Sequence, residues 1–159
     1  MPNQEIVSAV VDQFERSWQE LRDALVKTPA EEWTKGTPSY LVPARLGYHI
    51  LFTAETDATH MGYEEYKPHR KVKLDWEDAP SADLPSREEL FTRVNETEVT
   101  VKEWLLALGD EGLLDPERQY PWTGELRLGR ALYLLRHNQW HIGELNAILR
   151  ARGLEQIEW

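Results

Sequence analysis

The sequence contains no cysteine among its 159 residues. This absence excludes disulfide bonds, cysteine nucleophiles, iron–sulfur clusters and cysteine-based zinc sites, so any metal site has to use histidine, aspartate or glutamate. The sequence also lacks any run approaching the ~18 consecutive apolar residues of a transmembrane helix. No basic segment followed by an apolar stretch opens the chain, so we expect no signal peptide and a cytoplasmic location.

Basic residues are few compared with acidic ones. The chain has 18 Lys and Arg against 28 Asp and Glu, a formal net charge of −10. A surface of this sign disfavours phosphate backbones and anionic lipids, so we expect neither nucleic acid nor a membrane as a partner. Residues 127–152 are the exception, with five arginines and one glutamate. A small anionic substrate therefore remains compatible with the sequence.

Apolar residues recur at helical spacing in four long segments. We expect helices at about 3–27, 43–66, 86–108 and 126–152, with Gly109 and Gly153 ending the last two. No segment alternates with a period of two, so the prediction is a single all-α domain over residues 1–159, built as a four-helix bundle. The connection at 67–85 is long enough to return along the bundle as a crossover, and it is either a solvated loop or a lid over a site.

Two histidines stand four residues apart in the last predicted helix. His137 and His141 therefore lie on one face, one turn apart, and imidazoles so spaced can bind one divalent ion. They flank the apolar stripe of that helix, which consists of Ala131, Leu134, Leu135, Ile142, Leu145 and Leu149. The same spacing also suits two interfacial histidines that hydrogen bond to neighbouring side chains.

The second predicted helix offers a third ligand. Between its apolar sides runs a stripe of short polar residues and histidines, which favours the wall of an internal cleft: His49, Thr53, Thr56, Asp57 and His60. His49 and His60 are separated by about 16 Å along a helix, so only one of them can join the pair. Helix geometry does not choose between them.

Three other residues are candidates for catalysis. Asp57 can act as a general base or hold a ligand imidazole by its second nitrogen. Glu144, three residues after His141, can act as a base, support that imidazole or pair with an arginine. Arg130 can contact an anionic substrate or form an ion pair at the helix end.

These histidines carry a resemblance to a known family. His49, the His137-xxx-His141 pair and the following residues 142–153 resemble the DinB-like superfamily, which includes metal-dependent hydrolases called YfiT-like. The resemblance implies an up-down-down-up bundle with a long crossover between helices two and three. It also implies a three-histidine metal site of His49, His137 and His141, and a homodimer.

The resemblance implies chemistry on a small molecule. Characterised relatives include S-transferases that use a low-molecular-weight thiol and maleylpyruvate isomerases, so we expect a metal-dependent hydrolase or a thiol-dependent S-transferase. We expect Zn²⁺ or Ni²⁺ ahead of Mn²⁺ or Fe²⁺, although imidazole ligands accept all four. The alternative is a non-enzymatic dimeric helical bundle with a structural or vestigial metal site.

Overall fold

The computed structural model describes residues 4–69 and 76–158. Within these residues it contains α1 (Glu5–Lys27), α2 (Pro43–Asp57), α3 (Tyr63–Tyr66), α4 (Arg87–Leu113) and α5 (Arg127–Ala151), with 3₁₀ turns η1 (Ala30–Glu32), η2 (Lys67–His69), η3 (Ser81–Asp83) and η4 (Pro121–Thr123). The described residues form no strand, only an isolated bridge between Pro116 and Leu126. The prediction of an all-α fold is confirmed. None of the helices described has the length and apolar character needed to cross a membrane.

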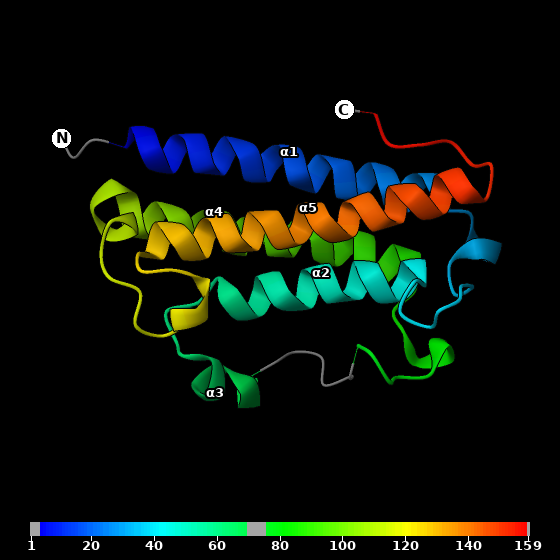
Figure 1. The fold of residues 1–159 in the computed structure, drawn as a ribbon, viewed down its shortest axis with the longest axis horizontal. Coiled ribbons are helices and arrows are strands. Elements are labelled where there is room, and N and C mark those ends of the chain that lie inside the picture. The colour runs from blue at the N-terminus through cyan, green and yellow to red at the C-terminus, as the bar shows by residue number, and fades with distance from the viewer. Residues whose placement is uncertain (1–3, 70–75, 159) are drawn as a thin grey trace.

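The four long helices lie side by side. In Figure 1, α1 and α5 run in one direction and α2 and α4 run in the other. The helix α1 packs against α4 and α5, and α2 packs against the same two helices. The helices that carry the predicted histidines, α2 and α5, are therefore direct neighbours.

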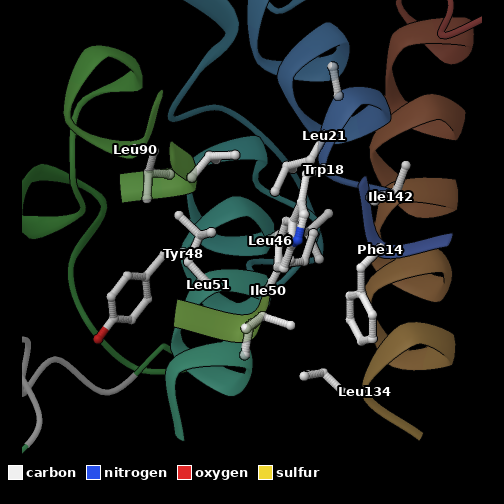
Figure 2. Packing of buried hydrophobic residues seen from close by; sticks show 14 of the residues in the cluster. Phe14, Trp18, Leu21, Leu46, Tyr48, Ile50, Leu51, Leu90, Leu134 and Ile142 are labelled. Carbon is white, nitrogen blue, oxygen red and sulfur yellow. The ribbon is translucent and has the colours of Figure 1, made fainter. Parts of the chain in front are cut away.

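The core is filled from one face of α1. Its apolar residues recur every three or four positions, so that a single stripe is buried along the helix. Figure 2 shows Phe14, Trp18 and Leu21 from this stripe in one buried cluster with residues of α2 and α5, among them Leu46, Ile50, Leu134 and Ile142. The burial of each of these large side chains stabilises the packed helices by about 1.5–3 kcal/mol.

The second helix ends earlier than the sequence predicts. The prediction of one helix over 43–66 is wrong about where the helix ends. The helix α2 stops at Asp57, and Ala58 leaves the helical region with φ −84° and ψ 57°. Side chains from distant segments donate hydrogen bonds to the backbone carbonyl oxygens at this end of α2. Arg130 donates hydrogen bonds to the carbonyl oxygens of Asp57 and Thr59, and the Tyr120 hydroxyl donates to that of Thr56 at 2.8 Å. These long-range bonds, which local spacing cannot reveal, satisfy a helix end that would otherwise need water.

Two predicted helix boundaries are confirmed. Ser86 and Glu89 form a reciprocal capping box at the start of α4: the Ser86 hydroxyl accepts from the Glu89 amide at 3.1 Å, and the Glu89 carboxylate accepts from the Ser86 amide at 2.7 Å. At the other end of the chain, Gly153 follows α5 with a φ of +67°. Glycine adopts this left-handed conformation without strain, as the sequence analysis expects for a helix stop.

The predicted end of α4 at Gly109 is wrong by about one turn. Gly109 does leave the helical conformation, with a φ of 61°, but helical turns continue to Leu113. The extra turn has a tertiary role: the Asp110 carboxylate accepts hydrogen bonds from the amides of Ile6 at 3.1 Å and Val7 at 2.8 Å. It thereby satisfies free amides in the first turn of α1.

Candidate metal centre

Three histidines from two neighbouring helices converge on one point. His137 and His141 lie one turn apart on α5, and His49 faces them from α2. One nitrogen from each ring can be chosen so that all three lie within 4.8 Å of one another. The His49 and His137 Nε2 atoms are 2.9 Å apart, and the three ring centroids are 4.6–4.7 Å apart. His60, the alternative to His49, is exposed and lies beyond the end of α2.

The spacing of the nitrogens suits a shared divalent ion. Two nitrogens that each lie about 2.1 Å from an ion are about 3.0 Å apart at a right angle and about 3.4 Å apart at the tetrahedral angle. The observed Nε2–Nε2 separation of 2.9 Å is close to the first of these distances. The donor set of three neutral imidazoles is one that zinc, nickel, manganese and iron all accept.

The environment keeps the imidazoles of His49 and His137 neutral. Burial, reinforced by the neighbouring His137 and His141 rings, lowers the pKa of His49 from 6.5 to about 3. Burial and the His141 ring likewise lower the pKa of His137 to about 4. Because an imidazole binds a metal only through an unprotonated nitrogen, both rings are ready to act as ligands at neutral pH.

Glu144 orients His141. Its carboxylate Oε2 lies 2.7 Å from His141 Nδ1, so it accepts a hydrogen bond from that nitrogen when the ring is a metal ligand through Nε2. A carboxylate in this position fixes the tautomer of the ring and raises its basicity. Of the roles that the sequence analysis considers for Glu144, the geometry matches the one in which Glu144 supports the His141 imidazole.

We expect the Glu144→Ala variant to bind Zn²⁺ or Ni²⁺ about 10–100-fold more weakly than the wild type, the usual effect of losing a carboxylate behind a ligand imidazole. Glu144→Gln keeps a weaker acceptor and should fall between the two. Competition titration with a chromogenic chelator measures these affinities. Glu103→Ala, at an exposed position on α4, is the matched control; equal affinities for Glu144→Ala and this control would rule out the supporting role.

A tryptophan that the sequence analysis did not single out covers His49. Trp76 lies in the connection between η2 and α4, of which residues 70–75 are outside the described residues. Its ring stacks on the His49 imidazole with centroids 3.8 Å apart and an interplanar angle of 21°. The Nδ1 atoms of His49 and His137 are buried without a hydrogen-bond partner among the described residues. The orientation of His49 therefore rests on packing against Trp76 rather than on a carboxylate.

A buried arginine holds Trp76 in place. Arg45 is 4% exposed, and its guanidinium donates to the carbonyl oxygens of Trp76 at 2.8 Å, Glu77 at 3.1 Å and Ala79 at 2.8 Å. Because Arg45 lies one turn before His49 on α2, the same helix carries the ligand and the anchor of the residue that covers it. A buried cation needs such hydrogen bonds to offset its lost hydration, and these carbonyl groups supply them.

Asp57 and Arg130 come together away from the histidines, at the C-terminal end of α2. Asp57 is eight positions after His49 along the helix, a distance of about 12 Å. The side chain of Arg130 is 2% exposed and lies 3.6 Å from the Glu117 carboxylate, with its guanidinium 3.7 Å from the Tyr120 ring centroid. This arrangement, which we call the Arg130 cluster (Asp57, Glu117, Tyr120 and Arg130), places the arginine inside the protein rather than at a surface open to substrate.

The Arg130 cluster makes stability depend on pH. Burial, with a smaller contribution from the Glu117 charge, raises the pKa of Asp57 from 3.8 to about 6, although Arg130 opposes the shift. Between these pH values the folded protein keeps a proton that the unfolded chain has lost, so stability falls as the pH rises. We expect wild type to lose about 1–3 kcal/mol relative to Asp57→Asn between about pH 4 and pH 7, with no further change above. Urea unfolding of both proteins across this range measures the difference; a constant difference would contradict the assignment.

A hollow on the surface of α5 adjoins the histidines. It is lined by Tyr133, Arg136, His137, Trp140 and His141 and has a volume of about 420 Å³. This volume lies within the range of small-molecule sites in proteins, about 300–1,000 Å³. Two of the three histidines are thus reached from a space that can hold a substrate.

Comparison with known proteins does not indicate an activity for this chain. Neither a family model, nor a curated protein, nor a solved structure matches the chain.

Proposed function

We propose that this protein is a metal-dependent enzyme that acts on a small molecule at an ion held by His49, His137 and His141. The observation that carries the proposal is the convergence of these three rings, two of them kept neutral by burial, beside a hollow of substrate size. Metal centres built from three protein ligands leave positions for water or substrate, which is the pattern of catalytic rather than structural sites.

The donor set favours hydrolysis or thiol transfer. A divalent ion with three neutral ligands keeps its full charge and can activate bound water or hold a thiol as thiolate. The chain's own residues supply the rest: Glu144 holds the His141 ring in one orientation, and Trp76 covers one face of His49. Since the chain has no cysteine, a transferred thiol has to come from a second, low-molecular-weight substrate.

We further propose that the fold is the up-down-down-up four-helix bundle of a DinB-like protein. The directions of α1, α2, α4 and α5 in Figure 1 support this arrangement. So does the pairing of α1 and of α2 with the other two helices. In this interpretation the connection from α2 to α4 is the long crossover, and Trp76 is the part of it that reaches the metal centre.

Metal analysis combined with an activity screen tests the proposal. We expect untagged protein to retain one equivalent of Zn²⁺ or Ni²⁺. We also expect the loaded protein to accelerate either hydrolysis of 4-nitrophenyl acetate or displacement of chloride from 1-chloro-2,4-dinitrobenzene by glutathione, each measured against His137→Ala. A protein that binds one ion yet matches His137→Ala in both reactions would favour a structural metal site instead.

A further inference from the structure

The hollow beside the histidines contains an arginine with no polar partner. Arg136 is exposed on α5, and no hydrogen bond or ion pair joins its guanidinium to any of the residues that the structure describes. The other arginines of residues 127–152 all have such partners: Arg127, Arg130, Arg150 and Arg152. In a chain of net charge −10, a cation left without an acidic neighbour next to a candidate metal centre is available to bind a ligand.

Two aromatic residues lie within about one helical turn of this arginine on α5. The Arg136 guanidinium carbon lies 5.5 Å from the centroid of the Tyr133 ring, and Trp140 follows one turn later with 69% of its surface exposed. Exposure of the apolar indole ring to water is unfavourable, and an apolar ligand that covers the ring removes this cost. Tyr133 and Trp140 both line the hollow together with His137 and His141, so apolar surface, cation and metal ligands border one space.

We propose that this hollow binds a small organic carboxylate with an aromatic or similarly flat apolar body. Its carboxylate pairs with Arg136, its body contacts Tyr133 and Trp140, and its other end faces the histidines. The guanidinium matches a carboxylate because its planar donors can form two parallel hydrogen bonds. Only the orientation of the reactive end rests on the proposed function; binding through Arg136 and the two rings does not.

Titration calorimetry with three probes tests the inference on the metal-loaded full chain. Phenylacetate carries both features, phenylacetamide lacks the charge, and acetate lacks the aromatic body. We expect phenylacetate to bind about tenfold more tightly than phenylacetamide, the effect of a charge-assisted hydrogen bond. We also expect it to bind more tightly than acetate, which has no aromatic surface to bury against Tyr133 and Trp140. Equal affinity for phenylacetate and phenylacetamide would overturn the proposal.

A variant at the arginine separates this site from the metal. Arg136→Gln should weaken phenylacetate binding about tenfold and leave phenylacetamide unchanged, while Arg136→Lys should lie between them. The control is Arg118→Gln, another exposed arginine, which lies outside the hollow and has no ion pair in the described part of the chain. Unchanged phenylacetate affinity in Arg136→Gln would contradict the inference.

Repeating the titration on metal-stripped protein distinguishes the two proposals. If phenylacetate affinity depends on Arg136 with and without the ion, the carboxylate site stands even where no metal-dependent activity is found. If phenylacetate binding requires the metal and is unchanged in Arg136→Gln, the carboxylate is a metal ligand. That result would overturn this inference but would leave the proposed metal centre intact.

Discussion

Replacing His137 with alanine is expected to lower the affinity for Zn²⁺ or Ni²⁺ by more than about 100-fold, because loss of a supporting residue alone costs 10–100-fold. His137 is central to the site: its Nε2 lies 2.9 Å from that of His49, and its ring centroid lies 4.6 Å from that of His141. Without it, two imidazoles from different helices remain, which is one ligand fewer than catalytic sites use. Equilibrium competition with a chelator of known affinity measures the change.

The matched control is His60→Ala. His60 is exposed and lies outside the cluster, so its loss should leave the metal affinity unchanged. Circular dichroism shows whether each variant keeps its helices, which separates a lost ligand from a lost fold. If His137→Ala binds metal as tightly as His60→Ala, the ion is held elsewhere.

Replacing Arg130 with methionine is expected to lower the free energy of unfolding by about 3–5 kcal/mol, since it leaves buried carboxylates without their counter-charge. The Glu117 side chain is 1% exposed and lies beside the guanidinium, and Asp57 is buried in the same cluster. The change also removes the hydrogen bonds to the carbonyls of Asp57 and Thr59 that close α2. Urea unfolding followed by circular dichroism at neutral pH measures the loss.

Arg127→Met is the control for this variant. Arg127 is also on α5 and pairs with Asp115 at 3.4 Å, but the side chains are 39% and 59% exposed, far more than those of Arg130 and Glu117. Exposed ion pairs contribute about 0–1 kcal/mol, so this variant should be nearly as stable as the wild type. Similar losses for the two variants would mean that Arg130 acts as an ordinary surface charge.

Local spacing was enough to predict part of the histidine cluster. His137 and His141 are one turn apart on a single helix, so their proximity follows from helix geometry alone. His49 is different, because its partners lie 88 residues away in the sequence. Helix periodicity did not distinguish His49 from His60 as the third ligand, and only the family resemblance favoured His49. In the structure, α2 ends at Asp57, so His60 lies outside the helix.

Residues that act over long distances in the chain were not predictable. Trp76 follows a charged stretch and looks like part of a solvated connection, yet it stacks on His49 because Arg45 binds its backbone. The end of α2 depends in the same way on Arg130 and Tyr120. By contrast, the capping box of α4 and the glycine after α5 were predictable, because both are local motifs.

X-ray absorption spectroscopy of the Zn²⁺- or Ni²⁺-loaded protein tests the central claim most directly. The account predicts three imidazole nitrogens at about 2.1 Å together with at least one oxygen ligand from water, and loss of one imidazole in His49→Ala. A closed sphere of four protein ligands, or a spectrum that His49→Ala leaves unchanged, would contradict it.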